Sequence, residues 1–235
     1  MWPACPNPKV AYKHFLKHPA MSAMQYIALA AALICLGSLL VFFLRLVRLG
    51  KPKDLSNKSG DTKKGVLYAN TTAMLPQNKE SAYLHLPSYA TGMLFHVGIF
   101  TSLLVFVLSF FPFFNRWIGG ADRIHLIIPI LLAFTSCCGY LLLFKRAFSK
   151  DLKPMSNPDD FISNFLTSTF QLATMLYLFF PASRCINILY YIVCTLLLLY
   201  FPLGKLRHVV YYFAARFHIG YFYGWRNVWP VNETE

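Results

Sequence analysis

Five long apolar runs limit what this sequence can fold into more than any other feature. They cover residues 24–44, 90–114, 124–144, 161–180 and 186–203. A helix crosses the apolar core of a bilayer with about 20 apolar residues, so each run is long enough to span it. With 57% hydrophobic and 13% charged residues in a chain of 235, a soluble domain could not bury this much apolar surface. The sequence therefore predicts an all-α membrane protein with five transmembrane helices.

The distribution of basic residues predicts the orientation of these helices. Sixteen of the 22 Lys and Arg residues follow the first, third and fifth runs, and six lie on the opposite side. Cytoplasmic loops of membrane proteins carry an excess of Lys and Arg. We therefore expect the N-terminus outside and the C-terminus in the cytoplasm. The net charge of +13 then reflects cytoplasmic loops, and nucleic acid is not expected as a partner.

These spans divide the chain into three parts. Residues 1–23 are expected to form an outer tail, residues 24–212 a membrane domain with a cytoplasmic loop at 45–88, and residues 213–235 a cytoplasmic tail. The fourth run is the most polar and is expected to face other helices rather than lipid. We expect the fifth run to continue as helix past Pro202, and we assign no fold to the loop 50–87.

Histidines rather than cysteines are the candidate cofactor ligands. The six cysteines form no CxxC or CxxCH motif, which argues against an iron–sulfur site, a zinc site or c-type haem in this chain. His96 lies inside the second run, in LFHVGIF, where an imidazole is costly unless it has a partner. A low-spin b-type haem takes two axial imidazoles, and His208 at the end of the fifth run is the natural second ligand. Lys205 and Arg207 would suit the haem propionates. The alternative for His96 is a core histidine bonded to a hydroxyl or carbonyl group.

The expected depths of the two histidines agree only in part. Along one continuous helix His208 would lie about 33 Å from Ile186, at the inner edge of a core about 30 Å thick. Counted from Ala90, His96 lies about 9 Å inside that edge. Both residues fall in the cytoplasmic half, and helix tilt would close much of the difference.

The remaining histidines have weaker assignments. His125 opens the third run on the outer side, and it is either a solvated helix start, a proton partner for a quinone head group, or a ligand of a second haem. In the last case its partner would be His14 or His18, on the same side. His85 is expected to be solvated, and His218 to serve a protein interface or the surface.

Two segments carry a resemblance to a known family. The stretches LFHVGIF and LLLLYFPLGKLRHVVYYF resemble the gamma subunit of respiratory nitrate reductase and its relatives, over roughly residues 90–210. These are five-span, quinol-linked cytochromes b of the inner membrane with the N-terminus outside. The resemblance implies that His96 and His208 ligate the haem nearest the cytoplasm. The tail YFAARFHIGYFYGWRNVWP is similar instead to cytochrome b subunits of heterodisulfide-reductase-like and sulfate-reducer redox complexes, whose partner is a cytoplasmic iron–sulfur subunit.

The resemblance also implies where a second, outer haem would be ligated. Those two positions fall near Phe106 and Tyr190, and neither side chain is an imidazole. A basic residue at the start of the third span assists quinol in that family, and His125 falls within about a residue of its place. One haem b is therefore expected, with two as the alternative.

Together these features predict an electron-transfer subunit of a respiratory redox complex. It would pass electrons between menaquinone or ubiquinone and a cytoplasmic iron–sulfur subunit, within a complex of several subunits in contact with membrane lipid. The aromatic and basic tail is expected to dock a partner or to lie on lipid as an interfacial helix. The alternative function is a membrane anchor without a cofactor. Ion-coupled transport is disfavoured, since four of the spans hold no Asp, Glu, Lys or Arg well inside the membrane.

Overall fold

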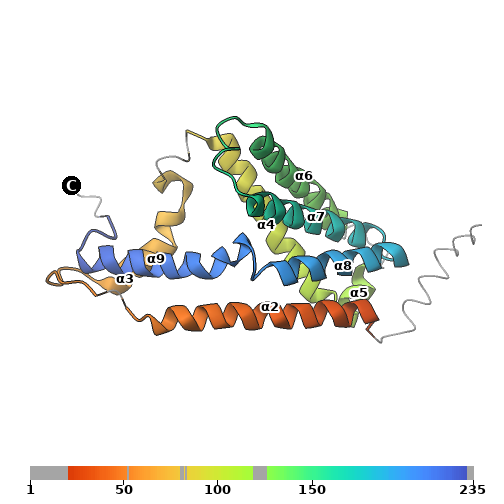
Figure 1. Ribbon diagram of the computed structural model, residues 1–235, viewed down its shortest axis with the longest axis horizontal. Helices are drawn as coiled ribbons and strands as arrows, with labels where there is room; N and C mark the ends of the chain where they lie inside the picture. Colours follow the sequence, from red (N-terminus) through yellow and green to blue (C-terminus); the bar gives the residue numbers. More distant parts are fainter. Residues whose placement is uncertain (1–20, 52, 80–81, 83, 119–125, 232–235) are drawn as a thin grey trace, which may run out of the picture. The chain divides into compact units, whose positions relative to one another are not determined.

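Every regular element in the described part of the chain is a helix (Figure 1). The computed structural model describes residues 21–231, except 52, 80, 81, 83 and 119–125. The predicted all-α class is confirmed for these residues. The α-helices are α2 (Ala23–Arg48), α3 (Thr62–Asn70), α4 (Leu86–Leu108), α5 (Pro112–Ile118), α6 (Ile127–Phe148), α7 (Pro158–Phe179), α8 (Arg184–Tyr200) and α9 (His208–Trp225). Short 3-10 turns are η1 (Thr72–Met74), η2 (Pro76–Asn78) and η4 (Lys205–Arg207).

Three to four of these helices could span a membrane. The helices α2, α4 and α6 are each long and apolar enough by themselves. A fourth span is counted when α8 and the following segment Lys205–Trp225 are taken as one interrupted span. The helix α7 is 22 residues long but does not reach the same apolar character, because polar side chains run along it. The chain is therefore a helical membrane protein by composition.

Two of the predicted run boundaries are wrong. The helix α4 ends at Leu108, and α5 begins separately at Pro112, so the second run is not one helix to Phe114. The expected continuation past Pro202 is also wrong, since α8 ends at Tyr200 and a turn follows. Pro202 has no N–H group for an i−4 bond, and the N–H groups of Leu203 and Gly204 both donate to the Tyr200 carbonyl, at 3.0 and 2.9 Å. The depth of His208 therefore cannot be counted along a single helix from Ile186.

The chain forms two compact units, each made of segments that are far apart in the sequence. One unit comprises Met1–Cys35 and Ala90–Gly204, and the other comprises Leu36–Tyr89 and Lys205–Glu235. We refer to them as the bundle unit and the hairpin unit. The loop 45–88 and the tail 213–235, which were expected to be separate parts, thus fall in one unit.

The core of the bundle unit is the polar helix α7, which packs against α6 and α8 (Figure 1). Gln171 is fully buried, and its Nε2 donates to the Phe95 carbonyl on α4 at 3.3 Å. Glycine on α4 makes this approach possible, because a Cβ at Gly98 would overlap Gln171 Oε1 and the Thr135 hydroxyl. The expectation that the fourth run faces other helices is confirmed by its buried polar residues, which are Ser163, Thr167, Ser168, Gln171 and Thr174.

The hairpin unit is a tight pair of helices, α3 against α9 (Figure 1). Asp61 caps the start of α3, and its carboxylate accepts from the Lys63 N–H at 2.8 Å. The two helix backbones approach each other at buried glycines of both helices, which are Gly65, Gly220 and Gly224. The Trp225 indole N–H donates to the Ser56 carbonyl at 2.9 Å, which ties the loop to the end of α9. The loop 50–87, for which no fold was expected, thus packs through its helix α3 against the C-terminal helix α9.

Candidate functional site

His96 lies on the exposed side of α4, with one ring nitrogen already bonded. Its Nδ1 is 2.7 Å from the carbonyl oxygen of Gly92, one turn earlier on the same helix. A carbonyl oxygen only accepts, so Nδ1 carries the proton and donates. The imidazole is bonded to a carbonyl, as the alternative of a core histidine expected, but its side chain is exposed rather than buried. Its Nε2, with a free lone pair in this tautomer, has no hydrogen-bond partner among the described residues.

Gly92 leaves room next to His96. A Cβ added at Gly92 would meet no other atom within 4 Å among the described residues. Glycine inside a helix costs roughly 0.5–1 kcal/mol relative to alanine, so an unpacked helical glycine is not explained by the helix itself. One turn before His96, the surface of α4 therefore carries no side chain, and none from the other described helices fills the space.

His208 has the same local geometry on a different helix. It is the first residue of α9, directly after η4, and its side chain is exposed. Its Nδ1 donates to the Lys205 carbonyl at 2.7 Å, which again leaves Nε2 with a free lone pair. Lys205 and Arg207 lie in η4 with exposed side chains, so both cations come shortly before the imidazole in the chain.

This arrangement is the one that metal-bound histidines adopt. Histidine ligands usually donate their second ring N–H to a carbonyl or carboxylate, which fixes the tautomer and the orientation of the ring. The donor chemistry of both residues therefore fits axial ligation of haem iron. His96 belongs to the bundle unit and His208 to the hairpin unit. Among the described residues no three His, Cys, Asp or Glu side chains form a metal-binding group, so a metal site with three or more protein ligands is not seen there.

The other histidines contribute little to a site. His125, His14 and His18, named above for a quinone or a second haem, lie outside the described residues. His85 is exposed, and His218 is half-buried with its ring edge-on to Phe217 at 5.7 Å between centroids. Neither is placed by the structure next to another candidate ligand.

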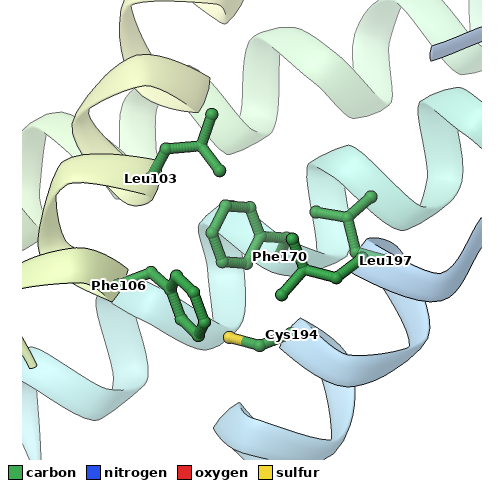
Figure 2. A pocket seen from close by; sticks show the side chains of 6 residues that line it. Leu103, Phe106, Phe170, Cys194 and Leu197 are labelled. Atoms are coloured by element: carbon green, nitrogen blue, oxygen red, sulfur yellow. The ribbon is translucent and has the colours of Figure 1, made fainter. Parts of the chain in front are cut away.

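The two positions implied for a second haem are filled by packed aromatic side chains. Phe106 on α4 is 5% exposed and Tyr190 on α8 is fully buried. Tyr190 stacks on Tyr177 with 4.5 Å between ring centroids. Figure 2 shows Phe106 and Cys194 beside an apolar crevice with Phe170, and its empty volume is about 160 Å³. Sites for small ligands run to roughly 300–1,000 Å³, so this crevice is too small for a porphyrin.

Sequence reasoning missed a polar cluster at the start of α7. Asn157 and Asp160 form a capping box, and Asp160 also pairs with Arg146 of α6 at 3.2 Å. The neighbouring Asp159 accepts hydrogen bonds from Ser163 at 3.1 Å and from Tyr200 at the end of α8. The available signal was the stretch NPDD, which places Pro and two acids in the first turn of a helix.

Comparison with known proteins gives no relative of this chain. No protein family model, no curated protein and no solved structure matches it.

Proposed function

We propose that this chain is the membrane cytochrome b subunit of a respiratory redox complex. It passes electrons between a menaquinone or ubiquinone pool and a cytoplasmic iron–sulfur subunit. One observation carries the proposal: His96 and His208 each donate Nδ1–H to a carbonyl of their own segment, at 2.7 Å, and each keeps Nε2 for a metal.

The chain's residues have distinct roles in this function. His96 and His208 would hold the haem iron through Nε2, and their backbone bonds keep each imidazole in the tautomer that can do so. Gly92, which has no side chain, would leave room for the haem beside His96. Lys205 and Arg207 offer exposed cations for carboxylates close to His208. The haem, when bound, supplies reversible one-electron chemistry at a potential set by these ligands and by burial.

The proposed topology has five spans, with the N-terminus outside and the C-terminus in the cytoplasm of an inner membrane. It adds α7 and α8 to the three helices that are apolar enough by themselves. A polar α7 is acceptable in this arrangement because its polar side chains are buried against other helices. The excess of Lys and Arg after α2, α6 and α8 supports the orientation.

The proposal includes a single haem b. The aromatic packing at Phe106 and Tyr190 favours one over two. Quinone would bind either at the outer face, with His125 as a proton partner, or in the cytoplasmic half near the haem. The aromatic tail, most of which lies in α9, serves the cytoplasmic partner, since Tyr, Phe, Trp and Arg are typical of interface cores.

The test is an absorption spectrum of the purified full chain, produced in a host that makes haem b. We expect a reduced b-type band and one haem per chain by pyridine haemochrome. His96→Ala and His208→Ala should each remove the band, and Gly92→Leu should lower haem content because its side chain fills the open space. His85→Ala, at an exposed histidine outside the site, is the matched control and should keep the haem.

A folded wild-type chain without a b-type band would refute the proposal and leave the cofactor-free anchor. Folding is checked independently by circular dichroism and size-exclusion chromatography. Retention of the full band in both histidine variants would refute the ligand assignment.

A further inference from the structure

Phe95, the residue before His96 on α4, has its ring fixed against α6. The side chain is buried, at 8% exposure. A Cβ added at Gly139 of α6 would lie 2.5 Å from the Phe95 ring, which is closer than real Cβ atoms come, and it would also overlap the Ser168 hydroxyl of α7. The ring therefore lies directly on the α6 backbone, beside α7.

The backbone of Phe95 is held from α7. Its carbonyl oxygen accepts a hydrogen bond from Nε2 of Gln171, at 3.3 Å, and Gln171 is fully buried. In a regular α-helix each carbonyl already accepts the N–H of the residue four positions later, so the bond from α7 is an additional one. A buried amide without a partner is unfavourable, so this bond opposes rotation of α4 about its own axis. Phe95 is thus held both by its ring and by its backbone.

The Phe95 ring in turn contacts the His96 imidazole. The ring centroids are 5.8 Å apart and the ring planes meet at 78°, which is an edge-on contact. The imidazole is also bonded through Nδ1 to the Gly92 carbonyl, at 2.7 Å. One hydrogen bond leaves an imidazole free to tilt about the bonded nitrogen, whereas a fixed ring beside it restricts that tilt. The Gly92 carbonyl and the Phe95 ring together define the plane of the imidazole.

We propose that Phe95 and Gln171 are positioning residues for His96. Gln171 and the α6 backbone hold Phe95, and the Phe95 ring sets the plane of the imidazole; neither residue supplies a ligand to the iron. Successive residues of a helix are turned by about 100°, so a buried Phe95 also keeps His96 on the exposed side of α4. All of these contacts lie within the bundle unit. The inference rests on the function proposed above.

The test uses Phe95→Leu and Gln171→Met in the haem-loaded full chain. Leucine keeps an apolar side chain but removes the ring, and methionine keeps an unbranched side chain but cannot donate to the Phe95 carbonyl. The readouts are the electron paramagnetic resonance spectrum of the oxidised haem and the haem affinity. We expect both variants to shift the g values of the low-spin signal and to lower the haem affinity by about tenfold, because groups around a metal-bound histidine orient its ring.

Phe106→Leu is the matched control. Phe106 lies on the same helix and is 5% exposed, but it lines the apolar crevice of Figure 2. It comes ten residues after His96, which is about 15 Å along the helix. This variant loses the same kind of buried ring, so it should lower the melting temperature as Phe95→Leu does. The low-spin signal and the haem affinity should stay unchanged.

Unchanged g values and haem affinity in Phe95→Leu, with a melting temperature lowered as in Phe106→Leu, would overturn the inference while the haem assignment stands. A shift in Phe95→Leu without one in Gln171→Met would overturn the part assigned to Gln171. If Phe95→Leu does not fold, Gly139→Ala displaces the same ring from α6 and should shift the low-spin signal; an unchanged signal there would overturn the inference equally. A wild-type chain without haem would instead refute the proposed function, and the inference with it.

Discussion

The glycine contact between α3 and α9 gives a sharp prediction for Gly220→Leu. A Cβ at this position would lie 2.6 Å from Val66 Cα and 2.8 Å from Ala69 Cβ. Carbon atoms pack at about 3.5–4.0 Å, so the two helices must move apart by about 1 Å to accept even the first carbon of the new side chain. Overpacking of this kind costs typically 1–3 kcal/mol, and a leucine between two backbones belongs at the upper end, about 3 kcal/mol.

This destabilisation should increase the fraction of chains in which α3 is separated from α9. A loss of about 3 kcal/mol changes the opening equilibrium by roughly a hundredfold. Lys63 and Lys64 are exposed on α3, and trypsin cleaves there only when the helix opens locally. Under conditions where reclosing is faster than cleavage, the cleavage rate follows the open population. We expect cleavage at these lysines, followed by mass spectrometry, to be up to about a hundred times faster in Gly220→Leu.

Gly37→Leu is the matched control for this experiment. Gly37 is also a helical glycine, but a Cβ there would meet nothing within 4 Å among the described residues. This variant should leave cleavage at Lys63 and Lys64 at the wild-type rate. Equal cleavage rates in Gly220→Leu and Gly37→Leu would show that α3 and α9 are not closely packed in the protein.

Two further predictions concern the hairpin unit and the topology. The pKa of Asp54 is lowered, first by the hydrogen bond from the Ser56 N–H and also by the charge of Arg226. The carboxylate therefore stabilises the folded unit at pH values above the unfolded pKa of about 3.9. This contribution is lost as the pH falls through the lower pKa of the folded state. The protection factors of residues 54–70, which divide the intrinsic hydrogen-exchange rate at each pH by the observed rate, should therefore fall between about pH 5 and pH 3. Asp54→Asn should weaken that pH dependence, and an unchanged profile in the variant would contradict this assignment. Cys185 is exposed at the start of α8, which the proposed topology places outside. A membrane-impermeant maleimide should therefore label it in intact cells. Labelling only after the membrane is opened would show that the orientation is the opposite one.

The sequence predicts the middle of each long helix better than its ends. Apolar runs indicate where the backbone must satisfy its own hydrogen bonds in lipid, and α2, α4 and α6 lie within or close to those runs. The end of α8 was missed because hydropathy continues past Pro202, whereas the break depends on two N–H groups that turn back to Tyr200. A turn made by backbone hydrogen bonds cannot be detected from the mean hydropathy of the surrounding residues.

The sequence points to the candidate ligands but not to their hydrogen bonds. His96 and His208 stand out in the sequence because an imidazole in or beside an apolar run needs an explanation. Their tautomers follow from the backbone carbonyls of Gly92 and Lys205, which only coordinates place. The pairing of α3 with α9 was missed although glycines at 220 and 224 have the spacing of a close helix contact. The partner helix lies in a loop without clear periodicity, about 150 residues earlier in the chain.

Because α3 packs against α9, it can reach its folded position only after the C-terminal part of the chain has been synthesised. Gly65 leaves the ribosome about 155 residues before Gly220, which at 5–20 residues per second is a wait of roughly 8–30 seconds. During that interval two or three further helices that could span a membrane are synthesised, while residues 62–70 remain accessible to proteases and chaperones. If translation stops before residue 208, α9 is missing and α3 stays exposed. Cellular quality control can then recognise a truncated chain by α3, which was synthesised long before the point of termination.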